Sequence, residues 1–335
     1  MKLTPGKLAG LKAVSDANGV IAAAAMDQRG SLQKSLAKER GAAATGEDLE
    51  VFKTCVTDVL CKHASAILLD PEYGLPAAKH RHGKGLLLAY EKTGYDSNTA
   101  GRLPDLLDVW SVRRLKEAGA DCIKILLYYT PFEKSHINDL KQAWIERIGD
   151  ECLAHDIAFF LEFVGYDADG GDEKTAAYAK KKPEIVSGAM AEFGKARYNV
   201  DVLKVEVPIV MEFVEGTKAF KGEKAYTRAE ALQHFRDAEG MTHKPFIYLS
   251  AGVSNPVFIE TLELAGESGT KFNGVLCGRA TWKDGIAIFA KHGEKAFRDW
   301  LETTGVENIN NVNKGLKGAS PWYLKFGAKS MDELG

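Results

Sequence analysis

The stretch that decides the fold runs from Asp201 to Pro208, and its sequence DVLKVEVP is typical of a buried β-strand, except for a lysine in its middle. In an extended chain successive side chains point to opposite faces, so Leu203, Val205 and Val207 form an apolar face and Lys204 lies on the other. The apolar face predicts packing against a core. Because unpaired buried charge is costly, the face of Lys204 must meet something other than a core.

Two further apolar runs each carry one charged residue in the same way. Residues 157–164 (IAFFLEFV) contain Glu162, and residues 121–128 (DCIKILLY) contain Lys124. Long charged side chains normally stay at the surface, so two lysines and a glutamate inside three strand-like runs are hard to explain as aids to solubility. The pattern predicts an active site.

A structural interpretation of these charges is also open. Lys204 and Glu206 lie two residues apart on one strand face and could form an ion pair within the protein. Glu162 could pair with Lys124 in the same way, because structural ion networks also place charges in buried strands.

The alternation of apolar runs with helix-like segments predicts the architecture. Eight runs are expected to be strands: 20–26, 65–70, 85–90, 121–128, 157–164, 201–207, 245–250 and 273–278. Between them, helices are expected at 47–63, 104–118, 137–154, 173–198, 227–239 and 255–268. Eight strand–helix units predict an α/β protein with a single-domain (β/α)8 TIM barrel over residues 1–326, followed by a C-terminal tail over 327–335. The first run is rich in alanine, which by propensity alone would favour a helix.

Composition and charge narrow the class of protein. The 335 residues are 45% apolar and 27% charged, which allows a large core, and this length is usual for an α/β barrel. A formal net charge of −2 gives no electrostatic case for binding nucleic acid or a membrane. No apolar segment has the length of a membrane span or the position of a signal peptide. The five cysteines show no CxxC spacing, which argues against a disulfide framework and fits a reducing cytoplasm.

Polar residues follow the expected strands at their carboxyl ends, where barrels of this type place their chemistry. Asp27, Gln28 and Arg29 follow the first strand directly. Gln28 and Arg29 are compatible with a grip on a phosphate or a sulfonate at the far end of a substrate. For Arg29 a surface salt bridge is the equal alternative.

The ends of the seventh and eighth strands are residues 249–254 (LSAGVS) and 276–281 (LCGRAT). In many barrels the loops at these two positions cradle a phosphate with glycine N–H groups, a hydroxyl and an arginine. Arg279 would supply a planar fork for such a group. Alternatively, Arg279 caps a helix or pairs with Glu72.

Six segments of the chain closely resemble the tagatose-1,6-bisphosphate aldolases of the class I, Schiff-base type. They are residues 26–30 (MDQRG), 69–75 (LDPEYGL), 88–95 (LAYEKTGY), 201–208 (DVLKVEVP), 248–254 (YLSAGVS) and 274–282 (GVLCGRATW). The similarity extends from about residue 10 to about residue 325, as expected for a shared domain. The chain departs from the family by extra length around 170–182 and by the tail, and neither touches these segments.

The resemblance implies cleavage of D-tagatose 1,6-bisphosphate into dihydroxyacetone phosphate and glyceraldehyde 3-phosphate by a homodimer, with no cofactor and no metal. In that family the lysine at the position of Lys204 forms the imine, and the glutamate at the position of Glu162 transfers protons. Lys124 and Asp27 match polar positions of the active site. The site for the phosphate of the dihydroxyacetone half is matched by Ser250, Gly252, Gly278 and Arg279.

The chemistry explains why these residue types are needed. Breaking a carbon–carbon bond next to a carbinol requires an electron sink at C2, and a protonated imine with lysine is a better sink than a ketone. An ordinary lysine is protonated at neutral pH, so burial or a nearby cation such as Lys124 must favour the neutral amine of Lys204. Glu162, in its apolar frame, is expected to have a raised proton affinity. It would take the C4 hydroxyl proton or the proton that moves between carbinolamine and imine.

Other functions stay open on the sequence alone. The protein could be an aldolase for a related ketose phosphate, such as fructose 1,6-bisphosphate or 6-deoxy-6-sulfofructose 1-phosphate, or a non-catalytic sugar-phosphate sensor. His80 and His82 could suggest the metal site of a class II aldolase, but no third ligand accompanies them at a suitable spacing. The run Lys180 to Lys182 is expected to be a solvated face, and Trp110, Trp144 and Trp300 are expected to pack on helices.

Overall fold

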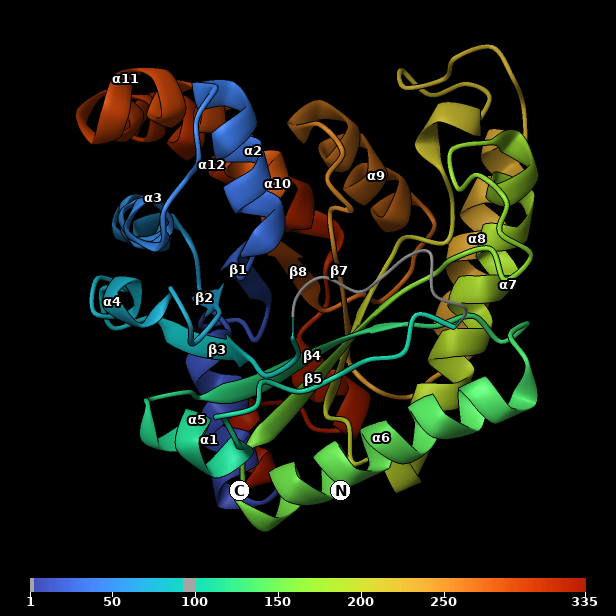
Figure 1. Cartoon of the computed structure of the whole chain (residues 1–335). Helices are drawn as coiled ribbons and strands as arrows, with labels where there is room; N and C mark the ends of the chain where they lie inside the picture. The colour runs from blue at the N-terminus through green and yellow to red at the C-terminus, as the bar shows by residue number, and fades with distance from the viewer. Residues whose placement is uncertain (1–2, 93–100) are drawn as a thin grey trace.

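Eight parallel strands form a closed barrel in the order of the chain (Figure 1). The computed structural model describes residues 3–92 and 101–335. The strands are β1 (Ile21–Met26), β2 (Ala66–Leu69), β3 (Gly85–Ala89), β4 (Cys122–Tyr128), β5 (Ala158–Val164), β6 (Val202–Val205), β7 (Phe246–Tyr248) and β8 (Gly274–Cys277). Each lies within one of the expected runs, so the predicted (β/α)8 barrel is confirmed.

The alanine-rich β1 is a strand because of its neighbours. It pairs with β2 from Ala24 to Met26 and with β8 from Ile21 to Ala24, so it is hydrogen-bonded on both sides. The side chains of Ala23 and Ala25 belong to the apolar cluster inside the barrel. Tertiary pairing therefore overrides the helical propensity of alanine.

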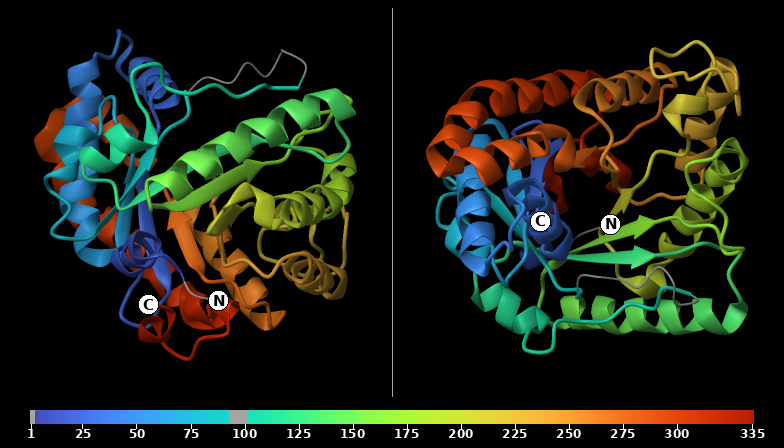
Figure 2. Two further views of the ribbon diagram at one scale, coloured as in Figure 1. Left: turned by 90° about the horizontal axis from the view of Figure 1, so that it is seen from below. Right: turned by 45° about the horizontal axis from the view of Figure 1, so that its top comes forward.

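Helices surround the barrel (Figure 2). They are α1 (Pro5–Val14), α2 (Gly30–Arg40), α3 (Gly46–Leu60), α4 (Leu75–Ala78), α5 (Val112–Glu117), α6 (Ser135–Ala154), α7 (Ala176–Phe193), α8 (Arg228–Gly240), α9 (Asn255–Glu267), α10 (Arg279–Trp282), α11 (Gly285–Trp300) and α12 (Val306–Gly315). The expected helices correspond to α3, α5, α6, α7, α8 and α9. Helices before β1 and after β8 were not anticipated, nor were α2 and α4. No helix in residues 3–92 and 101–335 is long and apolar enough to cross a membrane.

The expected helix over 104–118 is wrong in its first half, because only Val112–Glu117 is helical. Leu106 instead forms an antiparallel bridge with Glu91, and the N–H of Leu107 donates to the carbonyl of Tyr90. This segment therefore pairs with the chain just beyond the end of β3. Trp110 lies outside the helix but packs against the core, as Trp144 and Trp300 do from α6 and α11.

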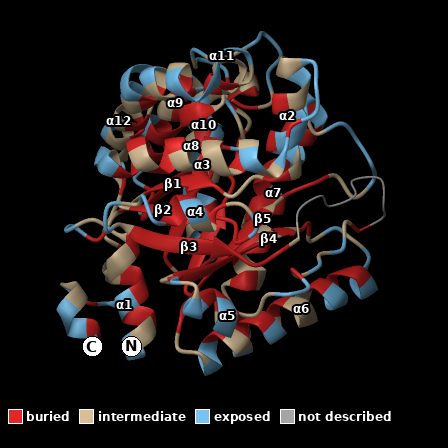
Figure 3. Ribbon diagram, turned by 60° about the vertical axis from the view of Figure 1, so that its left-hand side comes forward, coloured by how far each residue is buried: buried red, intermediate tan, exposed pale blue. Residues whose placement is uncertain are grey.

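Two apolar clusters hold the barrel together, one between strands and helices and one inside the barrel. The strands are almost wholly buried, and the helices alternate buried and exposed residues (Figure 3). The inner cluster is closed at the amino ends of the strands by Leu11 and Val14 of α1 and by Trp322. The tail after residue 326 packs there too: Leu334 is buried in the inner cluster, and its carbonyl accepts from the N–H of Leu3 at 3.2 Å. The opposite end, where the strands end and their following loops begin, is called the mouth below.

Candidate active site

Three charged side chains on neighbouring strands lie at the mouth of the barrel. Glu162 of β5 stands directly opposite Lys204 of β6 in the parallel ladder. Lys124 of β4 is paired with Phe160, two residues before Glu162. All three side chains are buried, with at most 6% of each residue exposed. The alternation of the strands therefore turns these charges to the inside, as the sequence predicts, while Leu203 and Val205 join the outer cluster.

One oxygen of Glu162 serves both lysines. The Nζ atoms of Lys204 and Lys124 each lie 2.9 Å from Oε2 of Glu162. The alternative ion pair between Lys204 and Glu206 is wrong, because Glu206 pairs with Lys182 of α7 at 3.1 Å and accepts the N–H of Gly165 at 2.7 Å. The ion pair between Glu162 and Lys124 does form, as part of a larger cluster.

Lys124 is the centre of that cluster. Its Nζ lies 2.8 Å from Oδ2 of Asp27 and 2.8 Å from Oε1 of Glu91, in addition to its contact with Glu162. Burial by itself would lower the pKa of Lys124, but the three carboxylates outweigh it and raise that pKa well above its ordinary value. Lys124 is therefore a fixed positive charge at working pH.

The two ammonium groups determine the charge of the carboxylates around them. Burial favours the protonated form of Glu162, but Lys124 and Lys204 outweigh it and lower its pKa. The expectation of a raised proton affinity for Glu162 is thus wrong in direction, because an apolar sequence frame does not reveal cations from other strands. Asp27 behaves in the same way, and Lys124 and Lys204 hold its pKa below the ordinary value against the effect of burial.

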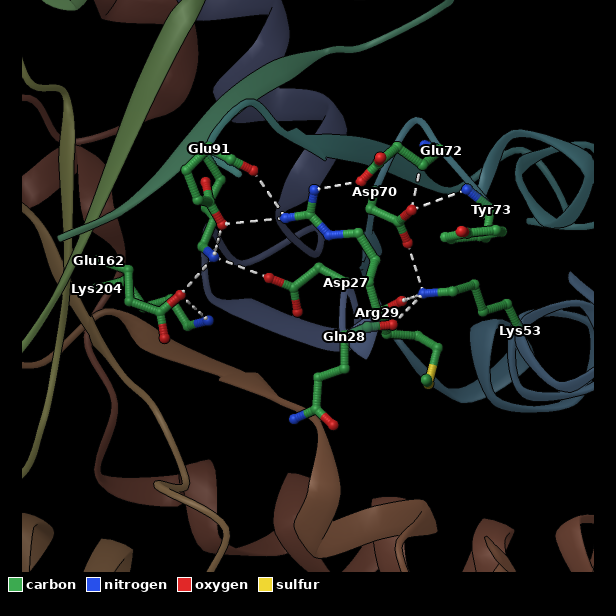
Figure 4. Close-up of polar contacts among 12 residues, drawn as sticks. Asp27, Gln28, Arg29, Lys53, Asp70, Glu72, Tyr73, Glu91, Glu162 and Lys204 are labelled. Carbon is green, nitrogen blue, oxygen red and sulfur yellow. Dashed lines mark hydrogen bonds and ion pairs between the residues drawn. The ribbon is translucent and has the colours of Figure 1, made fainter. Parts of the chain in front are cut away.

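A second set of charges lies beside Asp27, on the side away from Glu162 and Lys204 (Figure 4). Lys53 of α3 is fully buried, and its Nζ donates to the carbonyls of Met26 and Gln28 at 2.7 and 2.6 Å and to Oδ1 of Asp70 at 2.5 Å. Oδ2 of Asp70 accepts the N–H of Tyr73 at 2.8 Å. Sequence reasoning missed Lys53, since it lies on a helix with no neighbouring motif.

Arg29 is buried, with only 3% of the residue exposed. Its guanidinium pairs with Oε2 of Glu72 at 2.7 Å and donates to the carbonyl of Glu91 at 2.8 Å. The alternative of a salt bridge is therefore confirmed, but Arg29 is buried and does not lie at the surface. The side chain of Gln28 points away from these charges (Figure 4). Because Glu72 forms its ion pair with Arg29, the alternative pairing of Glu72 with Arg279 is wrong.

The loops after β7 and β8 come together as the sequence predicts. The guanidinium of Arg279 lies over Gly252: a Cβ built on Gly252 would come within 2.7 Å of the guanidinium carbon. Gly252 also has a φ of 78°, which favours glycine. Arg279 is exposed and, in residues 3–92 and 101–335, has no carboxylate partner. Ser250 is buried at the end of β7, and Gly278 precedes α10, with no room for a Cβ beside the carbonyl of Ala25.

Other charged residues singled out in the sequence lie elsewhere. Lys182 is buried and pairs with Glu206, so the expected solvated face over Lys180 to Lys182 is wrong for this residue. Lys181 pairs with Asp167 at the surface. His82 Nε2 lies 3.0 Å from Asp58. Within the described ranges, no group of three or more His, Cys, Asp or Glu side chains is arranged to hold a metal ion.

Comparison with known proteins identifies the family. The family described as DeoC/LacD family aldolase matches residues 21–284. The chain belongs to the DeoC/LacD aldolase family. A tagatose 1,6-diphosphate aldolase from Staphylococcus haemolyticus is 53% identical, over 95% of this chain and 98% of that protein. One of the same name from Lactococcus lactis is 52% identical, over 97% and 100%.

A solved structure of a fructose-bisphosphate aldolase from Plasmodium falciparum shares the fold. It has a TM-score of 0.65 and 15% sequence identity, and the match covers 93% of this chain and 96% of that one. At this identity the similarity supports the barrel fold and nothing finer.

Proposed function

We propose that this protein is a class I, Schiff-base aldolase that cleaves D-tagatose 1,6-bisphosphate into dihydroxyacetone phosphate and D-glyceraldehyde 3-phosphate. The relatives that carry the name tagatose 1,6-diphosphate aldolase support the substrate. The observation that carries the mechanism is the shared oxygen of Glu162, 2.9 Å from Nζ of Lys204 and 2.9 Å from Nζ of Lys124.

Lys204 is the proposed nucleophile. Glu162, whose pKa is lowered, is a carboxylate in the resting site and can accept a proton from the ammonium of Lys204 at 2.9 Å. The amine then attacks C2 of the ketose, and loss of water from the carbinolamine gives a protonated imine. Lys124 cannot replace Lys204, because three carboxylates keep it charged.

Cleavage follows from the imine. A base takes the C4 hydroxyl proton, the C3–C4 bond breaks, and its electron pair moves to the iminium nitrogen to give an enamine and the free aldehyde. Glu162 is placed to be that base or to serve the proton transfers of imine formation. Protonation of the enamine at C3 and hydrolysis then release dihydroxyacetone phosphate and restore Lys204.

Two groups of residues are proposed to hold the phosphates. Arg279, with Ser250, Gly252 and Gly278, would bind the phosphate next to C2 and thereby place C2 at Lys204. At the far end Gln28 is the better placed of the two predicted residues, because its amide is not engaged by the ionic cluster. Arg29 would reach a phosphate only by leaving Glu72 and the carbonyl of Glu91. Asp27, with 18% of its side chain exposed, can meet a substrate hydroxyl while it orients Lys124.

Trapping of the imine tests the proposal. We expect wild-type protein mixed with dihydroxyacetone phosphate and borohydride to gain a stable mass, with the label on Lys204 in peptide mapping. Lys204→Met should lose both trapping and cleavage, by a factor on the order of 10⁵ or more. A label on Lys124, or no label in active wild-type protein, would refute the assignment. A sugar-phosphate sensor would bind the ligand without a covalent adduct.

Metal independence is part of the proposal and needs its own test. Because the iminium accepts the electrons, activity should survive prolonged treatment with EDTA. Loss of activity that zinc restores would show that a Lewis acid is required instead.

The choice among ketoses is tested by comparing kcat/KM for tagatose 1,6-bisphosphate, fructose 1,6-bisphosphate and 6-deoxy-6-sulfofructose 1-phosphate. We expect the tagatose ester to be preferred. A higher value for the sulfonate would transfer the assignment to that substrate, since an amide such as Gln28 can serve either anion.

We also propose a homodimer. The proposed contact uses Phe132 and Leu140, just before and within the first turns of α6, whose exposed fractions are 55% and 56%. Light scattering should give twice the mass of the chain for the wild type and less for Phe132→Asp/Leu140→Asp. A monomeric wild type would refute this point alone.

A further inference from the structure

Lys53 is an unusual residue in a helix of an α/β barrel, because it is fully buried between α3 and the mouth. Its ammonium has three acceptors, and all three are provided by the ends of two strands: the carbonyls of Met26 and Gln28 after β1, and the carboxylate of Asp70 after β2. An ammonium has three protons, so its hydrogen bonds are complete. The residue between the two carbonyls is Asp27, so Lys53 holds the backbone on both sides of it.

Asp70 continues this connection into the next loop. It is fully buried, and the oxygen that does not contact Lys53 accepts the N–H groups of Glu72 and Tyr73 at 3.1 and 2.8 Å. Glu72 in turn pairs with Arg29 at 2.7 Å. The ion pair of Arg29 with Glu72 therefore joins the two loops directly, and Lys53 of α3 joins them a second time, through the carbonyls of Met26 and Gln28 and the carboxylate of Asp70 (Figure 4).

Stability alone does not explain such a pair. Burying two charges costs more than their attraction returns in many proteins, and apolar residues of similar volume often serve as well or better. A buried ion pair is better explained where it fixes one arrangement of the backbone. Here the arrangement in question is the place of one carboxylate, which lies 2.8 Å from Nζ of Lys124.

We propose that Lys53 and Asp70 are positioning residues for catalysis, which hold Asp27 against Lys124 and so fix the charge that faces Glu162. This inference rests on the proposed function, since it takes Asp27, Lys124 and Glu162 as the catalytic cluster. Neither Lys53 nor Asp70 contacts Lys124 or Glu162 in the described ranges, so their effect must pass through Asp27. A shift of Asp27 by about 1 Å would lower the rate by about 100-fold.

A double-mutant cycle between Lys53 and Asp27 tests this role. We expect Lys53→Met to lower kcat by about 100-fold with little change in KM, because the phosphate loops after β7 and β8 are untouched. Asp27→Asn should lose at least as much. The kcat of the double variant should lie no more than about threefold below that of Asp27→Asn, because Lys53 is proposed to act only through Asp27.

The matched control is Lys7, another buried lysine with a carboxylate partner, at the opposite end of the barrel. Its Nζ lies 2.9 Å from Asp201 and 3.3 Å from the carbonyl of Asn199. Lys7→Met should lower the melting temperature but leave kcat within about twofold of wild type, and its effect should add to that of Asp27→Asn as distant sites do. If Lys53→Met does not fold, Asp70→Asn replaces it, with an expected loss of about tenfold and the same lack of additivity.

Two results would show that Lys53 supports the fold only. One is a double variant whose loss of kcat equals the product of the two single losses, and the other is an unchanged kcat in a destabilised Lys53→Met. Borohydride trapping of the wild type is measured beside the cycle. Absence of trapping in active wild-type protein overturns the proposed imine mechanism and this inference with it, whereas a trapped wild type with an additive cycle overturns this inference alone.

Discussion

Both ends of the barrel bury a lysine beside a carboxylate, but the two arrangements differ in how completely the charges are satisfied. At the amino ends of the strands, Lys7 has Asp201 to itself, and Asp201 also accepts the N–H of Phe159 at 2.8 Å. At the mouth, Lys204 shares one oxygen of Glu162 with Lys124. Lys7 and its carboxylate partner form a complete pair. Lys204, in contrast, shares its carboxylate with Lys124, which has two further carboxylate partners.

The surroundings follow the same division. The amino end is closed by apolar side chains of α1 and by Trp322. The mouth instead carries three carboxylates around one ammonium, two just after β1 and β3 and one on β5. In barrels of this class the amino end serves stability and the mouth serves chemistry. The contrast indicates that a buried charge with an incomplete set of partners marks the reactive group, and a saturated one marks a support.

The largest effect that would test this contrast is expected for Glu162→Gln. Removing the carboxylate removes the proton acceptor of Lys204, so kcat should fall by about 10²- to 10⁴-fold. Trapping with dihydroxyacetone phosphate separates the two possible roles. Retained trapping assigns Glu162 to the C4 hydroxyl proton, and lost trapping assigns it to imine formation.

The control for this variant is Glu206→Gln. Glu206 is equally buried and lies two residues from Lys204, but it pairs with Lys182. Its loss should stay under about tenfold, because only indirect effects reach Lys204. Equal losses for both glutamates would refute a special role for Glu162 and weaken the comparison of the two ends.

The amino end should show the opposite behaviour. Lys7→Met leaves Asp201 buried without its cation, which should cost about 3–5 kcal/mol of unfolding free energy in urea denaturation at neutral pH. Burial already raises the pKa of Asp201, so this carboxylate can take up a proton as the pH falls, and the deficit should shrink. Lys12→Met, which removes an exposed pair with Asp332, should leave the unfolding free energy nearly unchanged, because solvent screens such a pair. A large loss of kcat in Lys7→Met would contradict the division.

Arg279 at the mouth is predicted to act on the substrate and not on the fold. Arg279→Ala should lower kcat/KM for the bisphosphate by roughly 30- to 1000-fold, because a charge-assisted contact to phosphate is lost. Arg279→Lys should recover only part of it, since a point charge does not reproduce the planar fork. On a ketose without the phosphate next to C2 the loss should disappear. An equal loss on both substrates would mean that Arg279 supports the loop around Gly252.

The strands were predictable because their signal is local. Each is a short apolar run, and the alternation of side chains placed Lys124, Glu162 and Lys204 on the inner face correctly. The helix over 104–118 was misjudged because pairing of Leu106 with Glu91 is a contact between segments distant in the chain. The short α4 between β2 and β3 has only four residues and leaves too little periodicity to detect.

The site was predictable to the same extent. Residues that end a strand could be placed at the mouth, and Arg279 and Gly252 do meet there. Lys53 could not be found, because its role depends on which strand ends α3 covers. The direction of the pKa of Glu162 could not be derived either, since it is determined by cations from β4 and β6 and not by its sequence neighbours.

Lys141 of α6 provides the smallest and most specific test of the comparison, because it is a buried lysine without a carboxylate in contact. Its Nζ lies 2.9 Å from the hydroxyl of Tyr166, and no carboxylate in residues 3–92 and 101–335 pairs with it. Burial lowers the pKa of Lys141 to about 8, although Glu133 acts in the opposite direction. The structure thus contains a lysine that is less satisfied than Lys7 and yet lies outside the proposed cluster.

The pKa of Lys141 is lower in the folded than in the unfolded protein, and this fixes the direction in which stability changes with pH. The ammonium is disfavoured in the fold, so the penalty is fully present below about pH 8 and is relieved as the pH rises toward 10.5. Wild-type unfolding free energy should therefore rise by about 2 kcal/mol between pH 7 and pH 9.5 relative to Lys141→Met, whose curve lacks this step. Denaturation of both proteins at several pH values measures the difference, which cancels the titration of other groups. A constant difference would show that Lys141 is as well satisfied as Lys7. The expected step would show instead that incomplete partnership marks a reactive lysine only together with a place in the cluster at the mouth.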